Sequence, residues 1–184
     1  MHRVIAFAMD LALVVVLIQL MSVLLPKSFG PEVENEFILF TESANQLLLE
    51  DLLNPEKMVE FTEETKPSPE MIVLLLMRTI CILCTPFAYW LAGDLFFKGS
   101  SLGKATFSQR AVSMRDGGSP NLFSALLRSF VKGMSALALI TPFALLGGVV
   151  FLTCLLNPGR RGLHDLLAGT ITVEEANPSV AKEP

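Results

Sequence analysis

Charged residues are scarce in this chain of 184 residues: they make up 17% of it, whereas 52% of the residues are hydrophobic and the mean hydropathy is +0.55. A soluble domain usually carries about 25% charged residues. So low a charge content, combined with long apolar segments, is typical of an integral membrane protein, which places much of its surface against lipid. The expected fold class is therefore all-α, a multi-pass transmembrane helical bundle.

Residue types that hold metals or form catalytic pairs are also rare. The chain has two histidines and three cysteines. Cys81 and Cys84 lie one helical turn apart in an apolar segment without further ligands nearby, so we interpret them, and Cys154, as small packing residues. The fragment SLGK lacks the spaced second glycine of a phosphate loop, and no nucleophile–base pair can be assembled. We therefore expect no enzyme, no metal, no cofactor and no nucleic-acid partner.

Two apolar runs are long enough to cross a bilayer. The first, Val4–Leu25, has about 22 residues, which suffices at about 1.5 Å per residue. We expect a retained transmembrane helix here rather than a signal peptide, because Asp10 lies inside the run and no small-x-small cleavage site follows it. The second runs from about Met71 to Phe97, and Pro86 is expected to kink it.

Residues 122–156 allow two arrangements. One is an amphipathic helix over Leu122–Lys132 followed by a single span over Met134–Leu156. The other is a helical hairpin broken next to Pro142. The single span would place the closing segment outside the cell, whereas the hairpin would return it to the cytoplasm. We favour the hairpin because Arg160–Arg161 favours the cytoplasmic side.

Acidic residues gather between the two clear spans. Residues 26–70 contain eleven acidic residues against three lysines, a net charge of −8, so the rest of the chain carries +4. Residues 98–121 have four basic residues and one acid. The positive-inside rule therefore places residues 98–121 and the N-terminus in the cytoplasm, and the acidic segment on the far side.

The organisation follows from these spans. We expect a single transmembrane domain over residues 1–175, in which residues 26–70 form an acidic non-cytoplasmic insertion, followed by a flexible tail over residues 176–184. Apolar residues within 37–53 have partly helical spacing, which predicts one or two short amphipathic helices on the membrane surface or on the spans.

Asp10 is the least expected residue of the first span. An aspartate near the centre of a membrane helix costs about 2.5–3.5 kcal/mol, so it should face a protein interior or a wet cavity and have a partner. Two interpretations stay open: an ion or proton site, or a buried polar pin that fixes how the helices pack. Arg3 shares its helix face, and Asp94 lies at a depth where it could pair with Arg3. Arg78 lies nearer the outer end and can extend outward.

Four fragments, taken in order, resemble the RDD family of small membrane proteins. They are RVIAFAMD, SLGKATFSQRAVSMRDGGSP, ALLRSF and GLHDLLAGTITV, and the resemblance that they carry covers most of the chain outside residues 26–70. The family's arginine then matches Arg3, its first aspartate matches Asp10, and its second matches Asp165, with Asp116 as the alternative. Two features depart from the family pattern: the segment after GK is more polar, and the acidic loop is longer.

The resemblance implies a polar cluster near the cytoplasmic half of the bundle. Its candidate members are Arg3, Asp10, Asp94, Arg128 and Asp165. The supporting residues are Gly103, which would allow a close turn, with Lys104 and His164.

Transport of an unidentified ion or ligand is what the family resemblance suggests. We expect a multi-pass protein of the bacterial inner membrane that contributes to transport of an ion or small ligand, with Asp10 as the titrating or ion-coordinating group and Arg3 as its electrostatic tuner. The alternative is a non-transporting scaffold or assembly factor that docks a partner through the acidic loop. Because one copy encloses little volume, the expected partners are the lipid bilayer and either further copies of the chain or another membrane protein.

Overall fold

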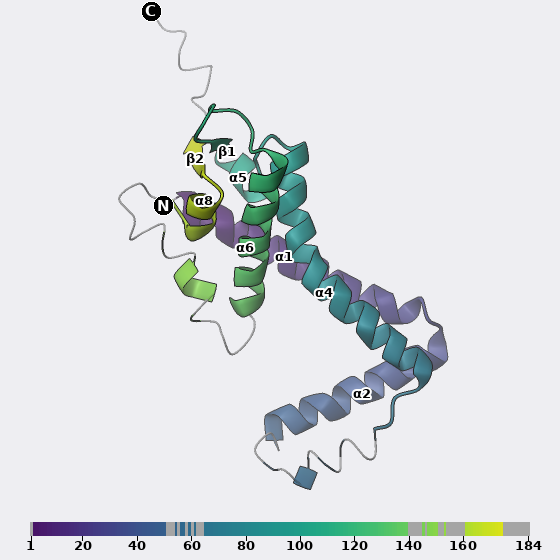
Figure 1. Cartoon of the computed structure of the whole chain (residues 1–184). Helices are drawn as coiled ribbons and strands as arrows, with labels where there is room; N and C mark the ends of the chain where they lie inside the picture. Colours follow the sequence, from purple (N-terminus) through teal and green to yellow (C-terminus); the bar gives the residue numbers. More distant parts are fainter. Residues whose placement is uncertain are drawn as a thin grey trace, which may run out of the picture. The chain divides into compact units, whose positions relative to one another are not determined.

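The computed structural model describes residues 2–50, 54, 56–57, 59, 61, 65–139, 145, 147–150, 153 and 161–174. Helices dominate this part of the chain, which confirms the expected all-α class. In chain order (Figure 1), the elements are α1 (His2–Lys27), α2 (Pro31–Glu50), α4 (Pro69–Phe96), α5 (Leu102–Thr106), β1 (Gln109–Ser113), α6 (Leu122–Leu139), α8 (Leu163–Leu167) and β2 (Thr170–Glu174).

Three of these helices, α1, α4 and α6, are long and apolar enough to cross a membrane by length and composition. The first two confirm both predicted runs, with ends that differ by at most two residues. Helix α4 continues through Pro86 without ending there. Apolar side chains on α1 and α4 remain exposed along their length, as expected of surfaces that face lipid.

Helix α6 decides part of the question left open for residues 122–156. It is continuous from Leu122 to Leu139, so the break expected near Lys132 in the single-span arrangement is absent. Pro142, where the hairpin would turn, lies outside the described residues. Farther along the chain, α8 packs on α6 and β2 pairs with β1, so the closing segment lies beside the loop that precedes α6.

The small sheet was not expected from the sequence. Strands β1 and β2 pair antiparallel, from Gln109 opposite Glu174 to Ser113 opposite Thr170. The amide of Ala111 also donates to the carbonyl of Gly99 at 2.8 Å. Gly99 has a φ of +85°, and a Cβ there would clash with the carbonyl oxygen of Ala111, so only glycine fits this turn.

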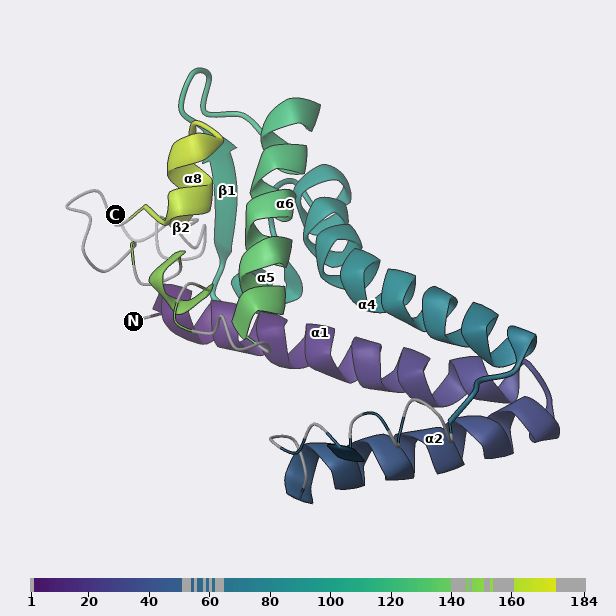
Figure 2. The ribbon, with the colours of Figure 1, turned by 60° about the horizontal axis from the view of Figure 1, so that its bottom comes forward.

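Contacts divide the chain into two compact units, Met1–Leu17 with Ile82–Pro184, and Ile18–Cys81. In the first unit, α8, β1 and α6 lie side by side (Figure 2), and α8 contacts both α6 and β2. This unit contains every residue that the sequence assigned to the polar cluster.

The second unit has a small apolar core of Val33, Met71 and Leu74. Glu36 of α2 accepts hydrogen bonds from the amide of Ser68 at 2.7 Å and from its hydroxyl at 2.6 Å, which holds the pKa of Glu36 below its usual value. The guanidinium carbon of Arg78 lies 5.3 Å from the centre of the Phe37 ring. The structure has one helix, α2, over most of the segment where one or two short helices were expected.

The antiparallel sheet makes a topological prediction. Asp116 lies in the turn after β1, and Glu174 ends β2. Single cysteines introduced there in a cysteine-free background, Asp116→Cys and Glu174→Cys, should react with a membrane-impermeant maleimide from the same side of a vesicle, because hydrogen-bonded strands cannot lie on opposite sides of a bilayer. Ser28→Cys, at the other end of α1, should react from the opposite side. Labelling of positions 116 and 174 from opposite sides would contradict the pairing.

Candidate functional site

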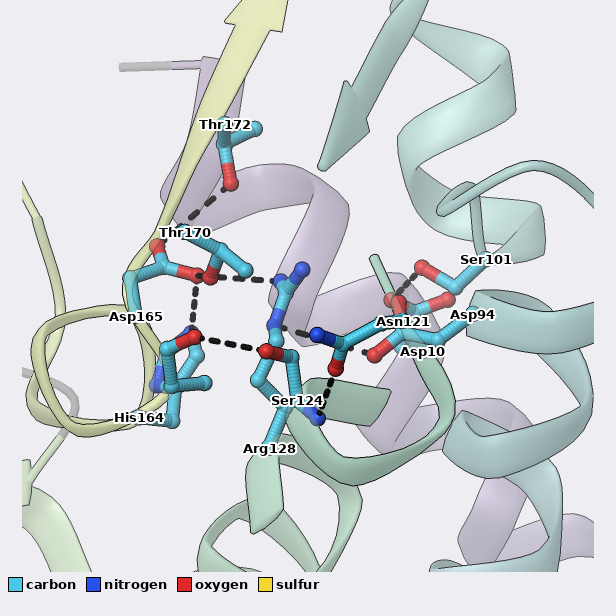
Figure 3. A network of polar contacts seen from close by, with 11 residues as sticks. Asp10, Asp94, Ser101, Asn121, Ser124, Arg128, His164, Asp165, Thr170 and Thr172 are labelled. Carbon is cyan, nitrogen blue, oxygen red and sulfur yellow. Dashed lines mark hydrogen bonds and ion pairs between the residues drawn. The ribbon is translucent and has the colours of Figure 1, made fainter. Parts of the chain in front are cut away.

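Asp10 is buried, with 2% of its surface exposed, and its carboxylate is held by three neutral donors of the same chain. Oδ1 accepts hydrogen bonds from the Tyr89 hydroxyl at 2.7 Å and from the Gly103 amide at 2.7 Å. Oδ2 accepts one from the Ser101 hydroxyl at 2.5 Å (Figure 3). Hydrogen bonds to a carboxylate are stronger than neutral ones and lower the cost of burying its charge. The arrangement fits the polar-pin interpretation, because both oxygens are already engaged.

Gly103 is what brings α5 close enough to α1 to reach Asp10. A Cβ at this position would clash with the carbonyl oxygen of Ala6 and would lie 2.8 Å from Oδ1 of Asp10. The sequence predicted that Gly103 allows a close turn. The residue instead lies within helix α5, and its φ is not positive. Its lack of a side chain therefore matters here, rather than its conformational freedom.

Arg128 of α6 is fully buried and lies between two carboxylates from different elements (Figure 3). Its Nη2 is 3.0 Å from Oδ1 of Asp165 on α8, and its Nε is 3.7 Å from Oδ2 of Asp94 on α4. A buried guanidinium needs such partners, because removing one of them leaves an uncompensated charge in a medium of low dielectric. Arg128 therefore joins α4, α6 and α8 at one point.

Asp165 is further held by strand β2. The hydroxyls of Thr170 and Thr172 donate to it at 3.3 and 3.5 Å. Burial raises the pKa of Asp165, but Arg128 and the neighbouring cations outweigh it and hold the pKa well below the usual value. His164 lies with Nε2 3.7 Å from Oδ1 of Asp165, and its pKa is lowered well below the usual value, mainly by burial. These shifts favour the neutral imidazole of His164 and the ionised carboxylate of Asp165.

Two lysines complete the set of buried charges. Lys104 of α5 is 9% exposed and Lys132 of α6 is 3% exposed. The ammonium of Lys132 lies 6.0 Å from the centre of the Trp90 ring, while Nζ of Lys104 has no hydrogen-bond partner among the described residues. Burial first, and then repulsion by Arg128 and Lys132, lowers the pKa of Lys104 well below its usual value. We call Asp94, Lys104, Arg128, Lys132 and Asp165 the charged cluster.

A sequence model of the RDD family matches residues 1–169, a range that includes Asp10 and the whole charged cluster. The chain belongs to the RDD family. No curated protein and no solved structure matches it. Family membership together with the three apolar helices makes this RDD protein a multi-pass membrane protein.

Arg3 and Asp165, which the resemblance assigned to the family signature, both contact strand β2 of this RDD protein. Arg3 donates from Nη2 to the carbonyl of Thr172, which ties the start of α1 to β2. Asp94 pairs with Arg128, and this pair differs from the Arg3–Asp94 pair considered from the sequence. Asp165 lies in the cluster, whereas Asp116 is exposed in a turn, where it accepts from the Gly118 amide at 3.3 Å.

Several residues of the site were missed by sequence reasoning. Lys132 follows Arg128 by four positions in an apolar helix, so the pair predicts one buried polar face, a signal that was available. The hydroxyl donors carry no such signal, because serine, threonine and tyrosine occur in membrane helices and loops for many reasons. The missed residues are Tyr89, Ser101, Lys132, Thr170 and Thr172. Within the described part of the chain, no group of three or more histidine, cysteine or acidic residues could hold a metal ion.

The close packing of α5 on α1 can be tested with Gly103→Ala. The added methyl group must displace either backbone or the Asp10 carboxylate, so we expect a loss of about 1–3 kcal/mol of unfolding free energy in detergent. Gly118→Ala is the matched control, because the nearest atom to a Cβ there is 3.6 Å away and the φ of Gly118 is not positive. It should change stability by less than about 0.5 kcal/mol. Equal stability of the two variants would show that α5 does not pack on α1 as described.

Proposed function

We propose that this RDD protein contributes to transport of an ion or small ligand across the bacterial inner membrane, with its N-terminus in the cytoplasm and without catalysing a reaction. The observation that supports the proposal is the charged cluster itself. Five ionisable side chains are buried together in a membrane protein, and one of them, Lys104, has an ammonium nitrogen without a hydrogen-bond partner among the described residues. Ionisable groups are costly in such surroundings and commonly mark ion or substrate pathways.

The charged cluster is a better polar centre for transport than Asp10. The Asp10 carboxylate already accepts three hydrogen bonds from its own chain, which leaves it little capacity to coordinate an ion. We therefore propose that Asp10 positions α5, and thereby Lys104, which directly follows Gly103. Arg3 would act in the same way, by holding β2 near the start of α1.

Lys104 is suited to respond to an ion because its charge is poorly supported. The pKa of Lys104 is lowered by burial and by two neighbouring cations, and only Asp94 and Asp165 oppose this effect. Both of these carboxylates already face the guanidinium of Arg128. The charge on Lys104 would therefore change with whatever enters or leaves the cluster. Since one copy of the chain is small, we propose that a path across the membrane needs further copies or a membrane-protein partner.

A scaffold role is the second candidate, and one observation favours it. Helix α2 carries acids in its first turn and leaves Leu39 and Leu49 exposed at 64% and 85%. A helix that exposes both acids and leucines could lie on a partner or on the membrane surface. In that role the charged cluster would only stabilise the fold.

Flux measurements in proteoliposomes separate the two candidates. We expect the wild-type chain to carry protons, Na⁺ or K⁺ down an imposed gradient. Lys104→Gln should reduce the rate about tenfold or more, because it removes the responsive charge and leaves the Arg128 ion pairs in place. Lys98→Gln is the matched control, an exposed lysine outside the cluster, and should retain the wild-type rate.

Two results would contradict the transport proposal. One is the absence of flux above that of protein-free vesicles for all three cations. The other is equal flux in the wild type and Lys104→Gln. Either result, with correctly folded and inserted protein, would favour the scaffold role.

A further inference from the structure

The polar atoms that lack partners in the first unit are mostly hydrogen-bond donors. Buried polar side-chain atoms in native proteins are rarely without a hydrogen bond. Among the described residues of the first unit, buried donors with neither a hydrogen bond nor an ion pair include Trp90 (Nε1), Lys104 (Nζ), Arg128 (Nη1) and Ser129 (Oγ). Nε and Nη2 of Arg128 lie at ion-pair distance from Asp94 and Asp165. Oδ2 of Asp94 also lacks a hydrogen bond, but it faces Nε of Arg128 in an ion pair. What the site lacks is therefore a hydrogen-bond acceptor.

The balance of charge in the cluster also indicates a missing anion. Three cations, Lys104, Arg128 and Lys132, are buried with two acids, and Arg128 lies at ion-pair distance from both acids. The third nearby carboxylate, Asp10, is engaged by neutral donors. Among the described residues, no carboxylate lies at ion-pair distance from either lysine. With both lysines protonated, the cluster by itself carries one positive charge in excess.

The three cationic side chains come from α5 and α6, and those of α6 face residues of α4. Asp94 faces Arg128, and Trp90, one turn earlier on α4, faces Lys132, one turn later on α6. Lys104 comes from α5 and is buried, and its pKa is lowered first by that burial and then by the charges of Arg128 and Lys132. Such a set of ammonium, guanidinium and indole donors is suited to a ligand with several acceptor oxygens.

We propose that Lys104, Lys132 and Arg128 form a binding site for a phosphate group, either as free inorganic phosphate or as the headgroup of a phospholipid. The inference rests on the proposed function because it assigns a ligand to the same cluster, and it does not make that ligand the transported ion. The oxygens of an ionised phosphate can together accept hydrogen bonds from several unpartnered donors, and the group needs few acceptors in return. Its negative charge also offsets the mutual repulsion of the three cations, which otherwise makes their burial costly.

Equilibrium binding to the full-length chain in a maltoside detergent tests the site directly. The probe is radiolabelled inorganic phosphate, with sulfate as the competitor. We expect saturable binding by the wild type and by Lys98→Gln, and binding weakened about tenfold or more by Lys104→Gln, because a buried charge contact is lost. A second arm adds phosphatidylglycerol to the micelles. Displacement of phosphate by this lipid assigns the site to a phospholipid headgroup, and unchanged phosphate binding assigns it to the free ion.

Thermal unfolding of the same proteins guards against a variant that merely fails to fold. In phosphate-free buffer, Lys104→Gln should melt at the same temperature as the wild type or higher, because it removes repulsion among buried cations. Added phosphate should raise the melting temperature of the wild type and of Lys98→Gln, but not that of Lys104→Gln.

Three results would overturn the inference: a wild type that binds neither phosphate nor phosphatidylglycerol, a Lys104→Gln variant that binds as the wild type does, or a Lys104→Gln variant that melts lower without any anion. Because binding is measured without a gradient, its failure is distinct from that of the transport proposal. Cation flux without phosphate binding would remove the anion site alone. Phosphate binding without flux would remove transport and keep the site.

Discussion

The burial of one guanidinium, that of Arg128, is the constraint on which the first unit depends. With no exposed surface, its charge must be met by partners that come from other elements. Asp94 supplies one from α4, and Asp165 supplies the other from α8. The chain after α6 therefore has to return to the start of that helix. The β1–β2 sheet holds this return in place, and the hydroxyls of Thr170 and Thr172 connect the strand to Asp165.

A second constraint is the burial of the Asp10 carboxylate, whose hydrogen-bond donors are neutral groups. Asp10 is buried in an apolar helix, and its carboxylate accepts hydrogen bonds from the neutral donors of Tyr89, Ser101 and Gly103. Two of these donors belong to the segment around α5, so the carboxylate fixes where that short helix lies on α1. Lys104 then follows Gly103 into the buried cluster. Asp10 and the Gly103–Lys104 pair thus act together: the aspartate and glycine set the approach of α5, and the lysine carries the charge.

Much of this arrangement could be predicted from the sequence, and the reasons differ by residue. The two long spans follow from runs of apolar residues, a signal that depends only on length and hydropathy. The placement of Asp165 with Arg128 followed from the family resemblance and from the cost of a buried charge. The sheet was missed because β1 is a short and polar segment, although the alternation of Thr170, Ile171, Thr172 and Val173 is typical of a strand. The donors to Asp10 could not be predicted, because hydroxyl and amide groups acquire that role only through the packing of α5 on α1.

The Arg128–Asp165 pair offers the most direct test of this account, through a double-mutant cycle measured as the free energy of unfolding in detergent. Arg128→Met and Asp165→Asn should each cost about 3–5 kcal/mol, because each leaves a partner charge buried and uncompensated. The double variant should lose less than the sum of the two single losses by at least about 1 kcal/mol, since residues in direct contact are coupled. Losses that simply add would show that Arg128 and Asp165 do not support each other. The return of the chain to α6 would then need another cause.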